Sequence, residues 1–151
     1  MGIRDFLKAI KETANEVSAT IGAPVYVLNC EICQSEGLHS AYGNYQMKIN
    51  FGISSASLPD AIEFEYMYVD MNGNIILEET YSCSSRNFKA NGNNLYVTAP
   101  MKNEPSLMAS SIGQAWPYRV FQNNGAFWSN NNYLKDEKRG REKIEMFLRE
   151  V

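Results

Sequence analysis

The chain has 151 residues, of which 44% are hydrophobic and 21% are charged, and its formal net charge is −3. This length and composition suit one globular domain with its own core and exclude wholesale disorder. The negative charge and the pI of about 5.2 disfavour nucleic acid and anionic membrane surfaces as partners. Apolar runs such as Val25–Leu28 are far too short to span a bilayer.

The amino-terminal residues Met1–Phe6 carry neither the apolar run of a signal peptide nor a myristoylation pattern. The three cysteines are an odd and sparse set, so we expect free thiols instead of a disulfide framework. We therefore expect a cytoplasmic protein, unless a leader preceded this sequence. The expected free thiols and the absence of an N-x-Ser/Thr glycosylation sequon both fit a bacterial or cytosolic setting.

The first elements along the chain are a helix and two strands. Apolar residues recur every three or four positions from Ile3 to Ile21 with charged residues between them, which predicts an amphipathic helix. Gly22 and Pro24 then mark its end. Pro24–Cys33 and Tyr45–Phe51 are rich in β-forming residues, so we expect a strand from each.

A β-hairpin is expected around Asn72-Gly73, the dipeptide favoured by two-residue type I′ turns. Such a turn pairs residues outward in a fixed register. On the apolar face the predicted pairs are Tyr68 with Leu77, Tyr66 with Glu79, Phe64 with Tyr81 and Ile62 with Cys83. The opposite face then collects Glu63, Glu65, Met67, Glu78, Thr80 and Ser82 as a mainly solvated surface. Glu79 is therefore the one charged residue expected on the core face.

The carboxy-terminal half is expected to contain more strand and helix. In chain order we expect a turn at 91–94, a strand at Leu95–Ala99, a short helix at 105–112, a hairpin joining Tyr118–Phe121 to 126–128, and a helix from Leu134 onward. Gly140 weakens the middle of that last helix. We therefore predict a single α+β domain, residues 1–151, with an antiparallel meander sheet of about five or more strands and helices at both termini packed on one sheet face.

The spacing of Cys30 and Cys33 suits a zinc knuckle, which His39 and Cys83 would complete as a Cys₃His set. Against this, three residues of separation along a strand place two side chains on opposite faces. The hairpin register also puts Cys83 on the apolar face. We favour buried free cysteines and keep a zinc-stabilised fold as an alternative.

Candidate catalytic groups are few. Glu79 on the core face beside Tyr66 has the chemistry of an acid or base in a cleft, with Tyr81 nearby. His39 is the only histidine of the chain, so imidazole chemistry would have to pass through it. Structural readings compete with each: Glu79 reaching water or the Tyr66 hydroxyl, and His39 solvated in a loop. No phosphate-binding loop, dinucleotide fingerprint or nucleophile elbow is present, so we expect no cofactor.

The most distinctive stretch, residues 116–133, mixes aromatic rings with amides. Such surfaces offer stacking area and adaptable hydrogen bonds. The residues predicted to bind a partner or ligand are Trp116, Tyr118, Phe121, Asn123, Asn124, Trp128, Asn130 and Tyr133. The competing interpretation is that the aromatics close the core while the amides occupy loops.

The sequence thus favours a small non-catalytic binding protein over an enzyme with an acid–base carboxylate or a zinc-stabilised fold. Its expected partner is a protein or a small polar ligand. A second copy of the chain, giving a homodimer, is one such protein.

Overall fold

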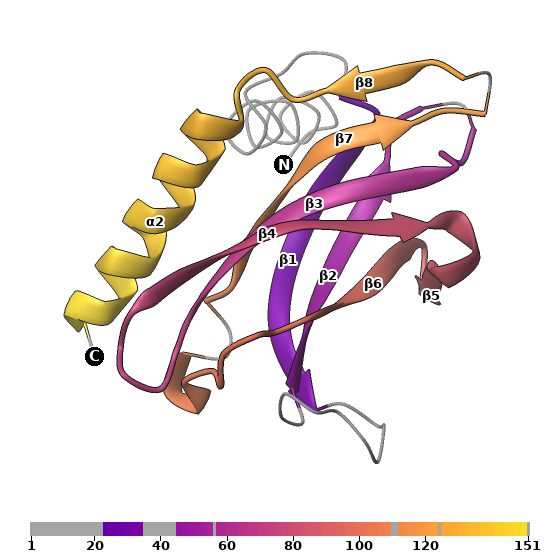
Figure 1. Ribbon diagram of the computed structural model, residues 1–151. Helices are drawn as coiled ribbons and strands as arrows, with labels where there is room; N and C mark the ends of the chain where they lie inside the picture. Colours follow the sequence, from indigo (N-terminus) through magenta and orange to yellow (C-terminus); the bar gives the residue numbers. More distant parts are fainter. Residues whose placement is uncertain (1–22, 35–44, 56, 110–111, 124, 151) are drawn as a thin grey trace, which may run out of the picture.

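The computed structural model describes residues 23–34, 45–55, 57–109, 112–123 and 125–150, with only the backbone for Glu79 and Leu107. Its strands are β1 (Val25–Gln34), β2 (Tyr45–Ile53), β3 (Ala61–Val69), β4 (Ile75–Ser84), β5 (Lys89–Asn91), β6 (Asn94–Pro100), β7 (Gln114–Phe121) and β8 (Phe127–Ser129) (Figure 1). Two 3₁₀ helices, η1 (Ser85–Asn87) and η2 (Leu107–Ala109), lie between strands, and the α-helix α2 (Tyr133–Glu150) follows them.

The strands form two antiparallel sheets of four strands each. Sheet A has the order β1-β2-β6-β5, and sheet B has the order β4-β3-β7-β8. The chain passes from sheet A to sheet B after β2, returns after β4 and crosses again after β6. The expectation of one meander sheet is therefore wrong, because hairpins account for only part of the strand pairing.

The main core lies between the two sheets, where each buries its apolar face. Met47 and Phe51 of sheet A and Phe64 and Tyr66 of sheet B belong to one buried cluster. The rings of Phe51 and Phe64 lie 5.5 Å apart across it. Alternation of apolar and polar residues shows which side of a strand is buried but not whether a helix or another sheet covers it. The mistaken α+β assignment has this cause.

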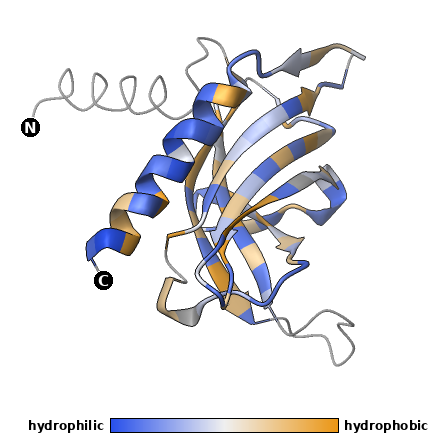
Figure 2. Ribbon diagram, turned by 60° about the vertical axis from the view of Figure 1, so that its left-hand side comes forward, coloured by the Kyte–Doolittle hydropathy of each residue, from blue (hydrophilic) through white to orange (hydrophobic). Residues whose placement is uncertain are grey.

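The helix α2 packs on the outer face of sheet B, where Met67, Val69 and Trp116 meet Ile144 in a second buried cluster. Outside the residues that pack on sheet B, most of α2 is hydrophilic (Figure 2). The carboxy-terminal half of β3 is therefore covered on both faces, which explains its unbroken apolar run, residues 66–69. Met67 was expected among solvated side chains, but it is fully buried in this second cluster.

Gly140 of α2 packs closely against β7. A Cβ atom added there would lie 3.2 Å from Gln114 Cβ and from Trp116 Cζ3. Glycine costs helix propensity, but at this position its lack of a side chain permits the close approach. The predicted carboxy-terminal helix is confirmed, and its glycine has a packing role.

The hairpin between β3 and β4 is confirmed, but its turn is longer than predicted. Asp70 accepts hydrogen bonds from the Gly73 amide through its carbonyl and from the Asn72 and Asn74 amides through Oδ1. Gly73 has a φ of 82°. Three residues therefore separate Asp70 from Asn74, the arrangement in which a left-handed glycine follows a type I turn. The Asp70 side chain favours it, because Asx turns cap neighbouring amides.

The longer turn shifts the register near it by one residue. Tyr66 faces Glu78, where the prediction placed Glu79. A bulge between Phe64 and Tyr66 then restores the predicted register, so that Phe64 faces Tyr81 as expected. The charged residue on the core face is consequently Glu78 instead of Glu79.

The predicted helices differ from the structure in extent. In place of the short helix expected at 105–112, the structure has the 3₁₀ turn η2. The expected helix from Ile3 to Ile21 lies outside the described residues, and α2 is the one α-helix among those that are described. None of the described helices is long and apolar enough to cross a membrane.

Candidate ligand-binding site

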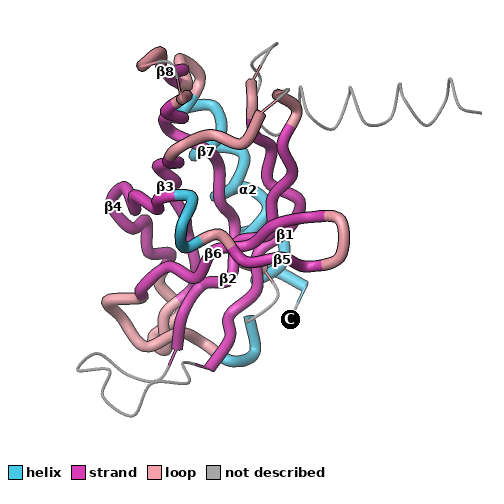
Figure 3. The backbone as a smooth tube through the Cα atoms, turned by 90° about the vertical axis from the view of Figure 1, so that its right-hand side faces the viewer, coloured by secondary structure: helices cyan, strands magenta, loops and turns pink. Residues whose placement is uncertain are grey.

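The outer face of sheet A carries polar side chains, whereas its inner face closes the core. The outer face of sheet A has no α-helix against it in the described part of the chain, since α2 packs on sheet B (Figure 3, in which α2 lies behind the strands). Glu31 of β1 and Lys48 of β2 form an ion pair on this outer face, with 3.6 Å between Glu31 Oε1 and Lys48 Nζ. Lys48 Nζ also lies 4.5 Å from the centre of the Tyr96 ring.

Three asparagines form a hydrogen-bonded row across this face, which we call the amide row: Asn29, Asn50 and Asn91. Asn50 Nδ2 donates to Asn29 Oδ1 at 2.7 Å, and Asn91 Nδ2 donates to Asn50 Oδ1 at 2.8 Å. The middle residue is only 5% exposed, but the two ends are exposed. Each amide thus orients the next, and hydrogen bonds in such chains strengthen one another.

The two ends of the amide row differ in chemistry. Asn29 retains its Nδ2 group as a donor, and Asn91 retains its Oδ1 atom as an acceptor, with no partner for either among the described residues. A hydroxyl group both donates and accepts, so one ligand hydroxyl suits each end.

A hollow of about 390 Å³ lies over the amide row. Its volume is within the roughly 300–1,000 Å³ typical of ligand pockets. It is lined by Leu28, Asn29, Cys30, Glu31, Asn50, Asn91 and Asn94. Four of these are asparagines, so amide donors and acceptors surround the space from all four strands of sheet A.

A bulge in β1 shapes one side of this hollow. The register with β2 shifts between Val27 and Asn29, which leaves Leu28 without a partner on β2 and 44% exposed. Nearby, Gly52 of β2 has no side chain, and a Cβ atom there would overlap the Tyr26 ring. The bulge therefore places Asn29 opposite Asn50 while Val27 still faces the core.

The residues predicted to bind a partner between 116 and 133 occupy different environments. Trp116 is 2% exposed and Asn130 is 3% exposed, so neither belongs to a surface. Asn130 donates to the Pro117 carbonyl and to Asp136 Oδ2, each at 2.8 Å, which ties β7 to α2. The half-buried aromatics of the set are Tyr118, Phe121, Trp128 and Tyr133.

The rest of this set lies in the β7–β8 turn. Asn123 is exposed there, and Asn124 lies outside the described residues. Phe127, 61% exposed, packs against Phe121 with ring centres 6.1 Å apart. Binding by this segment stays a prediction.

The base of α2 holds a buried carboxylate. Asp136 is 3% exposed, and burial raises its pKa to about 6, although the bond from Asn130 and the charge of Arg139 oppose the rise. Arg139 Nη1 lies 3.5 Å from Asp136 Oδ1. These groups join the helix to sheet B and do not face the hollow over the amide row.

The register correction changes the catalytic candidates. The side chain of Glu79 is not described, whereas Glu78 is 4% exposed and accepts hydrogen bonds from the Tyr68 hydroxyl at 2.5 Å and the Lys102 amide at 3.2 Å. The Tyr66 hydroxyl donates to the Pro100 carbonyl. Burial, followed by the charge of Glu78, raises the pKa of the Tyr66 hydroxyl. These bonds fasten the segment after β6 to sheet B.

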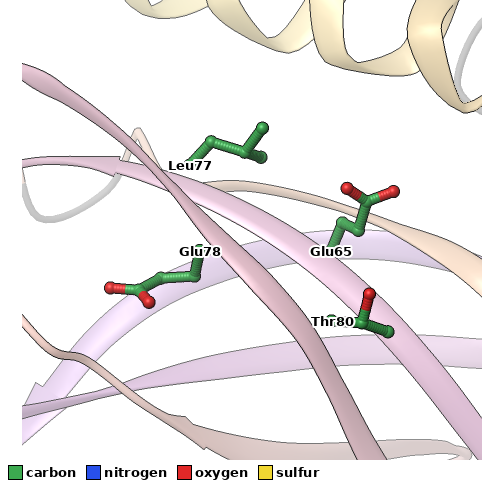
Figure 4. Close-up of a pocket in the computed structure, with 4 residues that line it drawn as sticks. All are labelled: Glu65, Leu77, Glu78 and Thr80. Atoms are coloured by element: carbon green, nitrogen blue, oxygen red, sulfur yellow. The ribbon is translucent and has the colours of Figure 1, made fainter.

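A second hollow, of about 410 Å³, is lined by Glu65, Leu77, Glu78 and Thr80. Glu65 and Thr80 point toward α2, whereas Glu78 points away from it (Figure 4). Trp116 Nε1 donates to Glu65 at 3.4 Å, and burial raises the pKa of this carboxyl. Since the two carboxylates lie on opposite faces of the sheet, they do not form an acid–base pair in this hollow.

The candidate zinc ligands are not assembled in the described part of the chain. Cys30 and Cys83 are buried in the core, and desolvation raises the pKa of both thiols. Cys33 is half-buried, and His39 lies outside the described residues. No group of three or more His, Cys, Asp or Glu side chains among the described residues is arranged to hold a metal ion.

Sequence reasoning missed the asparagines of sheet A. Asn29 and Asn50 lie in segments that were predicted as strands, where asparagine is disfavoured. Two such residues in β-forming runs were a local signal. The alignment of Asn29, Asn50 and Asn91 gave no local signal, because it depends on the order β1-β2-β6-β5 in the sheet.

Comparison with protein-family models, curated proteins and solved structures finds no match for this chain. Function therefore has to be argued from the residues themselves.

Proposed function

We propose that this chain is a non-catalytic binding protein that holds a small hydroxyl-rich ligand over the amide row of sheet A. The observation that carries the proposal is the nearly buried Asn50, which orients two exposed amides beside a hollow of about 390 Å³. A ligand with several hydroxyls, such as a sugar, satisfies both the donor at Asn29 and the acceptor at Asn91.

A purely structural role explains the amide row less well. Three asparagines in or beside paired strands lower β propensity, and threonine or valine would hold the strands at lower cost. Natural sequences depart from local preference mainly at functional sites. The outer face of sheet A, which no described helix covers, the hollow and the two amide ends without a described partner support ligand binding over bracing of the sheet.

Acid–base catalysis has weaker support. Glu78 is engaged by Tyr68 and by the backbone, and it lies apart from the amide row. A general base has to reach the proton that it removes, and neither described hollow combines a carboxylate with a second catalytic group.

The segment 116–133 is the second candidate surface, now reduced to its exposed members. Phe127 stacks on Phe121 beside the exposed Asn123, a combination that suits a protein partner, including a second copy of the chain. We also propose a cytoplasmic location, for which the support is the presence of three free thiols, Cys30, Cys33 and Cys83.

Two matched variants test the binding site. Asn50→Thr removes the central amide and introduces a residue that favours strands, so the fold should persist. We expect it to weaken binding of neutral monosaccharides about tenfold, since two oriented amides contribute on the order of 1.4 kcal/mol together. Asn123→Thr, the same substitution in the β7–β8 turn, should leave binding unchanged.

The readout is the ¹H–¹⁵N spectrum of the asparagine side chains during titration with glucose, galactose and mannose. Shifts confined to the amide row of the wild type support the site. Loss of binding in Asn123→Thr but not in Asn50→Thr would move the site to the 116–133 segment and refute the proposal.

A further inference from the structure

A smaller hollow, of about 190 Å³, adjoins the one over the amide row. It is lined by Val27, Leu28, Asn29, Cys30, Gly113, Gln114, Ala115 and Lys143. Leu28, Asn29 and Cys30 line both hollows, so both hollows border β1 at its bulge. β1 is the edge strand of sheet A and contacts β7 of sheet B there (Figure 1).

The smaller hollow, of about 190 Å³, adds a positive charge. Lys143 of α2 is exposed and has no acidic partner among the described residues. Its neighbours on the helix are paired: Arg139 lies 3.5 Å from Asp136, and Arg141 lies 3.7 Å from Glu137. At the hollow over the amide row, Glu31 is already paired with Lys48.

We infer, on the basis of the proposed function, that the ligand is an anionic polyol whose hydroxyls bind the amide row and whose acidic group reaches across the β1 bulge to Lys143. A sugar acid and a sugar phosphate share this chemistry. Both fit a site in which uncharged amides lie on one side of β1 and an unpaired ammonium group on the other.

The geometry assigns different tasks to the two parts. The amide row provides directional hydrogen bonds that fix the polyol, whereas a lysine ammonium is a flexible point charge without strict geometry. Lys143 is exposed, so its attraction for an anion is modest and is screened by salt. Affinity for neutral sugars should therefore depend on the row, and the preference for an acid should depend on Lys143.

The test compares glucose, galactose and mannose with their uronic acids and their 6-phosphates, at low and at high salt. Binding is followed through the side-chain amides of the row. At low salt we expect one class of acid to bind about threefold more tightly than its neutral parent, as an exposed ion pair provides. A preference for uronic acids identifies a carboxylate ligand, and a preference for 6-phosphates identifies a phosphate ligand.

Lys143→Gln should abolish the preference for the acid and leave the affinity for the neutral sugar unchanged. The matched control is Lys138→Gln, an exposed lysine of the same helix that lines neither hollow and should retain the preference. Equal binding of neutral and acidic sugars by the wild type overturns the inference about Lys143 but leaves the proposed function standing. If none of the sugars shifts the side-chain signals of the amide row, both the inference and the proposed function are contradicted.

Discussion

The Tyr68–Glu78 contact offers the sharpest test of the corrected hairpin register. The Tyr68 hydroxyl is buried, donates to Glu78 Oε1 at 2.5 Å and accepts from the Asn103 amide at 3.1 Å. Tyr68→Phe removes both hydrogen bonds without opening a large cavity. A bond to a charged group contributes about 1.5–3 kcal/mol and a neutral bond about 0.5–1.5 kcal/mol, so we expect a loss of about 3 kcal/mol of unfolding free energy.

Urea unfolding followed by tryptophan fluorescence measures this loss, with Tyr118→Phe as the control. Tyr118 packs edge-on against Tyr133, with ring centres 5.3 Å apart, and its hydroxyl has no partner in the described part of the chain. The control should change the free energy of unfolding by less than about 0.5 kcal/mol. Equal losses in the two variants would refute the buried contact and, with it, the placement of Glu78 on the core face.

A double-variant cycle separates this contact from general packing. Because Tyr68 and Glu78 share one hydrogen bond, which neither a phenylalanine nor a leucine side chain can make, the losses in Tyr68→Phe and Glu78→Leu should together exceed the loss in the double variant by about 1 kcal/mol or more. Strict additivity would show that the two side chains do not interact.

Two further predictions concern α2. Gly140→Ala should lower the unfolding free energy by about 1 kcal/mol despite a gain of about 1 kcal/mol in helix propensity, because overpacking against Trp116 costs about 1–3 kcal/mol; a raised Tm would contradict the close packing. Burial raises the pKa of Asp136 from 3.8 to about 6, so the folded protein holds a proton there that the unfolded chain has lost. The stability of the wild type relative to Asp136→Asn should therefore fall by up to about 3 kcal/mol between about pH 4 and pH 6 and stay level above. A difference that rises with pH, measured by urea unfolding at each pH, would show that the Arg139 charge outweighs burial.

Local signals in the sequence predicted most of the strands correctly. The β-forming runs that begin near Val25, Tyr45 and Leu95 all lie in strands, and Asn72-Gly73 lies in a hairpin turn. These features follow from side-chain alternation and turn chemistry, which act over a few neighbouring residues. The Asp70 side chain favours a turn that is one residue longer than predicted. This extra residue places Glu78, instead of Glu79, on the core face.

The sequence by itself thus determined most of the strands, the β3–β4 and β7–β8 hairpins and the carboxy-terminal helix, since each depends on contacts between near neighbours. Only the tertiary structure decided that the strands divide into two stacked sheets and that α2 covers one of them. It also decided that Asn29, Asn50 and Asn91 form one row, because residues far apart in the chain meet only through strand pairing. The candidate site is made of such distant residues, whereas the sequence showed only the contiguous aromatic segment at 116–133 as a binding surface.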